Sequence, residues 1–181
     1  MSNGRKTLFI ISFLIIDLLK EGNDVALVSD AGSPLISDPG YKLVRECRKQ
    51  GIKVTTIPGC CAVISALQLS GLPTNRFMFA GFVPNKDKAR LDLLNELKNI
   101  NATLVLYETA VRITKTLNTI KELMPDREVA IVREITKIHE ECILGDINDV
   151  AKQIEVVYLF LYFNVHFCVV GVPVLPPSSL L

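Results

Sequence analysis

The sequence of 181 residues contains no tryptophan and only two histidines, His139 and His166. It has five cysteines, Cys47, Cys60, Cys61, Cys142 and Cys168, but no two of them form a C-x-x-C pair. This pattern is typical neither of a zinc site nor of a disulfide framework. We therefore expect no metal centre and a reducing, cytoplasmic location.

The chain also lacks an excess of either charge, since 20 Lys and Arg face 19 Asp and Glu. Binding to a nucleic acid would therefore depend on a local patch of basic residues. Charged residues are absent from 156–181, which we call the uncharged tail. We expect this tail to be atypical and to be the part least connected with function. The apolar share of 49% and charged share of 22% exclude a disordered or collagen-like chain.

No apolar run reaches the ~20 residues that a membrane-spanning helix needs. The run 8–16 follows two basic residues, as the core of a signal peptide would, but no small-x-small cleavage site follows it. Asp17 and Lys20 instead continue it as an amphipathic helix, and Asn164 interrupts the apolar run 156–170. We expect no membrane segment.

Strands and helices alternate along the chain, which predicts an α/β fold with two lobes. In the first lobe, strands 25–28 and 52–57 should be parallel and flank a helix over 39–50 that Asp38 and Pro39 begin. Glycines after this helix and the preceding one predict left-handed helix ends.

The nearly apolar helix 60–70 should be buried, and 72–76 is the best domain boundary. The second lobe should contain strands 77–82, 103–107, 128–133 and 139–144 and helices 86–99, 110–123 and 147–155. The expected parts are an atypical N-terminal segment (1–19), the remainder of a cofactor lobe (20–75), a C-terminal α/β lobe (76–155) and the uncharged tail (156–181).

Two loops of the first lobe follow strands, at the edge of an α/β sheet where ligands bind. Glycines and short polar residues in 29–40 would let the backbone approach a small ligand, although the loop could equally be a turn in which Asp38 caps a helix. Residues 58–62 either form a second wall of that pocket or simply pack where the chain turns. The absence of P-loop and G-x-G-x-x-G motifs excludes typical nucleotidases and NAD enzymes, and Ser33 lies outside a G-x-S-x-G elbow.

Charged residues follow the strands of the second lobe. Glu134, Lys137, His139 and Glu140 could supply an acid, a base or a cation, or could form a solvated rim. The basic run of Lys86, Lys88 and Arg90 is the best candidate in the chain for contact with phosphate.

Six sequence blocks follow one another along the chain: VALVSDAGSPLISDPGYKLV, IPGCCAVISAL, SGLPTNRF, GFVPNKDKAR, LYETAVR and REITKIHEE. Together they resemble the tetrapyrrole methylase-like, class III methyltransferases, and most closely the branch that 2′-O-methylates the ribose of a cytidine in 16S ribosomal RNA. The resemblance covers about 20–155. It implies S-adenosylmethionine bound between two α/β lobes and a homodimer that acts on the small ribosomal subunit. The family's N-terminal strand and glycine-containing loop have no counterpart here, so we expect a truncated first lobe.

The resemblance also assigns roles to residues. The residues that it implies for cofactor binding are Asp30, Ala31, Gly32, Ser33, Pro34, Ile36, Ser37, Cys60, Cys61, Ala62, Tyr107 and Glu108. RNA binding falls to Lys86, Lys88, Arg90 and Arg112. In the implied reaction the ribose hydroxyl attacks the sulfonium methyl, and Lys137, Glu134 and then Asp30 are the candidates that would accept the proton or stabilise the alkoxide.

Two alternatives stay open. One is a tetrapyrrole methylase from the same family, but the YE-x-x-x-R and RE-x-T-K blocks favour the branch that acts on RNA. The other is a truncated fragment without catalytic activity.

Overall fold

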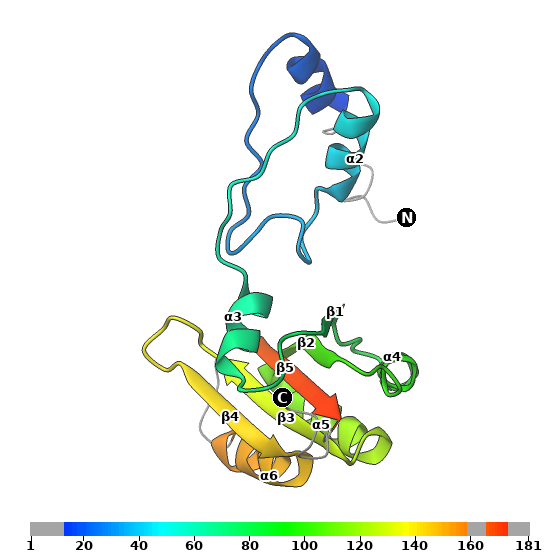
Figure 1. The fold of residues 1–181 in the computed structure, drawn as a ribbon, viewed down its shortest axis with the longest axis vertical. Coiled ribbons are helices and arrows are strands. Elements are labelled where there is room, and N and C mark those ends of the chain that lie inside the picture. Colours follow the sequence, from blue (N-terminus) through cyan, green and yellow to red (C-terminus); the bar gives the residue numbers. More distant parts are fainter. Residues whose placement is uncertain (1–12, 159–165, 174–181) are drawn as a thin grey trace. The chain divides into compact units, whose positions relative to one another are not determined.

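The computed structural model describes residues 13–158 and 166–173. The chain divides into two compact units between Cys61 and Ala62 (Figure 1). This division precedes the boundary that we expected at 72–76, because helix α3 (Ala62–Leu69) packs against strand β5 of the second unit. Within the described residues, no helix has both the length and the apolar character required to span a membrane.

The helices of the first unit end as their glycines predicted. Residues 13–20 are helical, and Gly22 follows at φ +90°. The amide of Gly22 donates to the carbonyl of Leu19, and that of Asn23 donates to the carbonyl of Leu18. This pair of bonds is the Schellman arrangement, in which a left-handed residue satisfies the last carbonyls of a helix. Gly51, at φ +70°, ends helix α2 (Tyr41–Lys49) in the same way.

The predicted start of α2 is wrong. Gly40, not Asp38, is the residue that precedes the helix, and no side chain caps it. Gly40 has a φ of +138°, and a Cβ there would lie 2.8 Å from Cδ2 of Leu27. The chain therefore enters the helix through a conformation that only glycine adopts easily, which moves the start beyond Pro39.

The βαβ unit expected in the first lobe is also absent from the described residues, where 25–28 and 52–57 have no regular secondary structure and belong to no sheet. Val28 is 81% exposed and Ile57 is 90% exposed. A strand forms only where a neighbour accepts and donates its backbone hydrogen bonds, and no described segment pairs with either stretch. The predictions of strands over 25–28 and 52–57 are therefore wrong, because an apolar composition does not by itself supply a pairing partner.

The second unit contains the predicted elements around a five-stranded sheet. Its strands are β1 (Phe77–Phe82), β2 (Thr103–Thr109), β3 (Arg127–Arg133), β4 (Glu141–Asp146) and β5 (His166–Pro173), in the spatial order β1-β2-β5-β3-β4. Its other helices are α4 (Asp87–Leu97), α5 (Ala110–Leu123) and α6 (Ile147–Tyr158). Each of these elements except β5 confirms a segment predicted from the alternating pattern.

Strand β5 lies within the uncharged tail, for which the sequence predicted no strand. This strand lies in the middle of the sheet and pairs antiparallel with both β2 and β3. A central strand has a neighbour on each side, so its backbone donors and acceptors are paired along both edges. The tail therefore contributes to the fold of the second unit.

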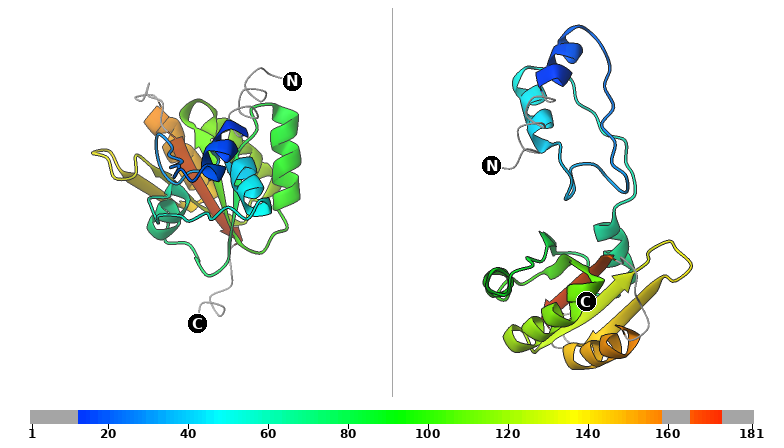
Figure 2. Two further views of the ribbon diagram at one scale, coloured as in Figure 1. Left: turned by 90° about the horizontal axis from the view of Figure 1, so that it is seen from above. Right: turned by 180° about the vertical axis from the view of Figure 1, so that it is seen from behind.

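The core of the second unit lies between the sheet and helices α4, α5 and α6. Its fully buried side chains include Leu94, Ile113, Leu117, Ile131 and Ile147, each of which stabilises the fold by about 1.5–3 kcal/mol. Helix α3 contacts β5 and lies on the face of the sheet opposite α5 and α6 (Figure 2, right). Ile143 of β4 points into the core, whereas its neighbour Cys142 reaches the carbonyl of Leu69 at the end of α3.

Candidate functional site

The carboxyl ends of three strands meet at one edge of the second unit. Strands β1 and β2 are parallel, and β2 and β3 both run antiparallel to the β5 strand between them. The three strands therefore share a direction, and the segments 83–88, 109–112 and 134–140 all leave from the same edge (Figure 1). This is the edge at which ligands bind in open α/β sheets. Most of the residues predicted for chemistry in the second lobe lie in these segments.

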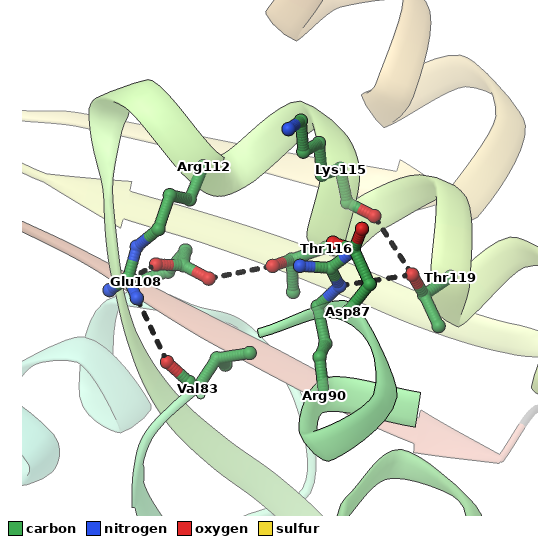
Figure 3. Close-up of polar contacts among 8 residues, drawn as sticks. All are labelled: Val83, Asp87, Arg90, Glu108, Arg112, Lys115, Thr116 and Thr119. Atoms are coloured by element: carbon green, nitrogen blue, oxygen red, sulfur yellow. Dashed lines mark hydrogen bonds and ion pairs between the residues drawn. The ribbon is translucent and has the colours of Figure 1, made fainter. Parts of the chain in front are cut away.

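The Glu108 carboxylate at this edge is buried, and its side chain is only 1% exposed. Its Oε1 accepts the amide of Thr109 at 2.7 Å and contacts Arg112 Nη2 at 2.8 Å. Its Oε2 accepts the hydroxyl of Thr116 at 2.6 Å (Figure 3). Both oxygens thus accept hydrogen bonds from residues in or next to the first turns of α5, and negative charge is favourable at the N-terminus of a helix. The side chain predicted to bind cofactor acts here as an internal anchor.

Two arginines that we predicted to bind RNA are likewise engaged within the protein. Arg112 contacts Glu108 and donates to Thr109 Oγ1 at 3.0 Å and to the carbonyl of Val83 at 3.1 Å. Arg90 is 7% exposed and donates to Asp87 and to Thr119 (Figure 3). All three guanidinium nitrogens of Arg112 have partners in the chain, so the structure gives no support to direct phosphate contacts by either arginine.

The two lysines of the same block are in a different position. Lys86 and Lys88 are exposed, on either side of the start of α4. They follow a bulge in β1, where Gly81 has a φ of +77° and the pairing with β2 shifts. Their exposure keeps them available for phosphate.

Tyr107 helps to fix this end of β1. Its ring centroid lies 4.9 Å from that of Phe79 and 5.1 Å from that of Phe82. Tyr107 is half-buried in this aromatic cluster, and its carbonyl accepts the amide of Val83 at 3.0 Å.

The loop 134–140 joins β3 to β4 and is tightly folded. Glu134 and Thr136 have left-handed φ angles of 51° and 65°. The Thr136 amide donates to Glu140 Oε2 at 2.6 Å, and Lys137 Nζ lies 3.1 Å from Glu134 Oε1. His139 is exposed beside them. Two non-glycine residues in this conformation carry a backbone cost of order 1 kcal/mol or more each, a kind of strain that concentrates at functional sites.

The first unit holds the other candidates, the loop 29–37 and the segment before α3. The Ser33 hydroxyl donates to the carbonyl of Cys60 at 3.0 Å, so the two predicted walls lie together. The Ser29 hydroxyl closes the loop by donating to the carbonyl of Gly32 at 2.9 Å. Exposed residues here are Asp30, Ala31, Gly32, Ile36, Ser37 and Cys60, and Pro34 and Cys61 are half-buried. Ala62, also exposed, is the first residue of α3 in the second unit.

Sequence reasoning missed the partners that hold the candidate residues. Thr116 and Thr119 of α5 supply hydroxyls to Glu108 and Arg90, and their only sequence signal is their spacing along one helix. Arg127, 4% exposed, also went unnoticed. It donates to the carbonyls of Lys98, Ile100 and Ala102, and burial lowers its pKa from the ordinary value. Among the described residues, no cluster of three or more His, Cys, Asp and Glu could hold a metal ion.

Known proteins resemble this chain in both sequence and fold. A protein from Rickettsia prowazekii named ribosomal RNA small subunit methyltransferase I is 48% identical over 138 residues, which are 76% of this chain and 49% of that protein. The chain thus spans about half the length of this relative.

Two solved structures share the fold. A diphthine synthase matches with a TM-score of 0.68 and 18% identity, over 93% of this chain and 67% of its own. The uroporphyrin-III C-methyl transferase from Thermus thermophilus complexed with S-adenyl homocysteine matches with a TM-score of 0.53 and 17% identity, over 88% and 71%.

The model of the tetrapyrrole (corrin/porphyrin) methylases matches residues 5–151. The match begins inside the segment 1–19 that we expected to be atypical, and it extends over both units. Together with the shared α/β fold, it confirms the resemblance carried by the six sequence blocks: this chain belongs to the tetrapyrrole methylase family.

Proposed function

We propose that the chain is part of an S-adenosylmethionine-dependent methyltransferase that 2′-O-methylates the ribose of a cytidine in 16S ribosomal RNA. The name of the Rickettsia prowazekii relative supports this substrate class. The observation that carries the chemistry is the Lys137–Glu134 pair on a strained loop at the carboxyl edge of the sheet. We further propose a cytoplasmic homodimer.

The loop 29–37 is the proposed holder of the cofactor. Gly32 has a φ of +78° and no side chain, so its backbone can approach a ligand closely. Ser33 fixes the loop to Cys60, and the exposed residues of the loop other than Ile36 are short or polar. This donor set fits the polar amino acid and nucleoside parts of S-adenosylmethionine. When bound, that cofactor supplies an electrophilic methyl group and a good leaving group.

The protein must then remove the proton of the ribose hydroxyl. The Glu134 carboxylate is the proposed acceptor, because its side chain is 19% exposed and faces a cation 3.1 Å away. Lys137, 65% exposed, can remain paired with Glu134 and stabilise the negative charge that develops on the ribose oxygen. Asp30, exposed in the first unit, is the third candidate. The exposed Lys86 and Lys88 would contact phosphates of the RNA.

Calorimetric titration with S-adenosylmethionine tests the cofactor part of the proposal. We expect saturable heat from the wild-type chain and weaker binding after Gly32→Val, whose side chain would be strained at φ +78°. The absence of binding by the wild-type chain at millimolar cofactor would favour a non-catalytic fragment.

Substitution of Lys137 tests the catalytic part. Lys137→Ala should lower kcat for methylation of small ribosomal subunits by about 10²-fold or more. Lys152→Ala is a matched control, because Lys152 forms a pair of the same i,i+3 spacing with Asp149 on α6. Equal turnover by Lys137→Ala and the control would exclude the assigned role.

A further inference from the structure

The segment 84–88 carries Lys86 and Lys88 and is held at each end by an arginine. Arg112 of α5 holds its beginning, and Arg90 of α4, which bonds Thr119 of α5, holds its end. At its beginning, both backbone groups of Val83 are bonded: the amide donates to Tyr107 of β2, and the carbonyl accepts Arg112 Nη1 of α5. Val83 is 1% exposed. Since its amide and carbonyl are both engaged, the direction in which the chain leaves β1 is fixed.

Arg112 is itself held in place from the other side. The Glu108 carboxylate contacts its Nη2 at 2.8 Å, and Thr109 Oγ1 accepts from its Nε. The planar guanidinium therefore bridges the end of β2, the start of α5 and the chain after β1 (Figure 3). This rigid plane presents a separate nitrogen to each of three groups, whereas a lysine would offer its donors from a single nitrogen on a flexible chain.

A second arginine holds the other end of the segment. Arg90, on the first turns of α4, donates to Asp87 Oδ1 at 2.7 Å and to Thr119 Oγ1 of α5 at 3.3 Å. The Thr119 hydroxyl donates in turn to the carbonyl of Lys115. The Arg90 side chain is 8% exposed, whereas that of Asp87 is 81% exposed. Arg90 therefore joins the start of α4 to the middle of α5 (Figure 3).

We propose that Arg112 and Arg90 are positioning residues that preform the segment 84–88, so that Lys86 and Lys88 meet RNA phosphates without first being ordered. This inference rests on the proposed function for its ligand. A loop ordered before binding loses less conformational entropy when it binds, and affinity rises accordingly. The arginines thus affect RNA affinity through the lysines and make no phosphate contact of their own.

A double-mutant cycle separates positioning from direct contact. We expect the Lys86→Ala/Lys88→Ala double variant to weaken binding to small ribosomal subunits by roughly tenfold at low salt. Arg112→Met should weaken it by a similar factor in the wild-type background and by less than about twofold when both lysines are already absent. If the fold-loss in affinity caused by Arg112→Met is the same with and without the two lysines, Arg112 contacts phosphate itself and the proposal is overturned. Wild-type affinity after loss of both lysines would also overturn it.

Amide hydrogen exchange tests the anchoring without RNA. Exchange of the Val83 and Arg90 amides, which donate to the carbonyls of Tyr107 and Lys86, should accelerate in Arg112→Met and, to a smaller extent, in Thr119→Val. It should be unchanged in the control Arg48→Met, which removes a bond to the carbonyl of Val54 in the first unit. Arg112→Met leaves the buried Glu108 without its cation and could unfold the chain. In that case the double variant Arg112→Met/Glu108→Gln, which removes both charges, takes its place in the exchange experiment.

Unchanged protection of the Val83 and Arg90 amides in a folded Arg112 variant would overturn the proposal. The exchange result also keeps the two proposals distinct. If the chain fails to bind RNA at all, the proposed function fails and with it the ligand named here, whereas faster exchange would still establish that the arginines hold the segment.

Discussion

Replacing Glu108 tests the buried network from which α5 begins. Its carboxylate is 1% exposed and has three donors at 2.6–2.8 Å. Removing one partner of a buried ion pair costs about 3–5 kcal/mol. Because the Arg112 side chain is 21% exposed and can be partly hydrated, we expect Glu108→Ala to cost about 3 kcal/mol, near the lower limit.

Glu108→Gln keeps the shape but loses the charge. The amide oxygen can still accept from Thr109 and Arg112, and the amide nitrogen can donate to the Thr116 hydroxyl oxygen. The cost should therefore fall to about 1–2 kcal/mol, the difference between charged and neutral hydrogen bonds. Urea unfolding followed by circular dichroism measures both values. Glu96→Ala, an exposed position on α4, is the control and should stay within about 0.5 kcal/mol of wild type. A loss below about 1 kcal/mol for Glu108→Ala would refute the buried anchor.

Three further predictions concern the second unit. Gly81→Ala should cost about 1 kcal/mol because of its left-handed φ, with no atom within 4 Å of the new Cβ, and Gly145→Ala should be nearly neutral in the same unfolding assay. Val170→Pro should prevent folding of the sheet, since Val170 pairs with both β2 and β3, whereas Val170→Ala keeps the backbone donor; equal circular dichroism spectra would argue against a central β5. Hydrogen bonds from Asn148 lower the pKa of Asp146, so this carboxylate stabilises the fold above its unfolded pKa of ~3.9 and loses that effect as pH falls through its lower folded value. The melting temperatures of wild type and Asp146→Ala should therefore differ at neutral pH and converge in acid, and a gap that widens in acid would contradict this.

Local patterns predicted the second unit well because its elements obey local rules. Glycine and proline mark the boundaries between many of these elements, and apolar residues recur at a different spacing in helices than in strands. Strand β5 could not be inferred in the same way, since its place between β2 and β3 depends on pairings far apart in the chain. The same limit explains the first unit, where Val28 and Ile57 have strand-forming neighbours in sequence but no pairing partner among the described residues.

The candidate site shows a similar limit for side chains. The sequence identified the block that contains Lys86, Lys88 and Arg90 as basic, but a residue type does not say which member is buried. Packing of α4 and α5 decides that, and it places Arg90 inside while both lysines stay exposed. The Ser33 hydroxyl donates to the carbonyl of Cys60, so these two segments lie together, while their role in binding the cofactor stays a prediction.

Mapping of 2′-O-methyl groups tests the central claim most directly. Small ribosomal subunits that lack the modification are incubated with the chain and S-adenosylmethionine carrying a labelled methyl group, and the label is located in the RNA. The account predicts one labelled cytidine ribose with wild type and its loss with Lys137→Ala. Label on a base, or transfer to a tetrapyrrole but not to RNA, would contradict it.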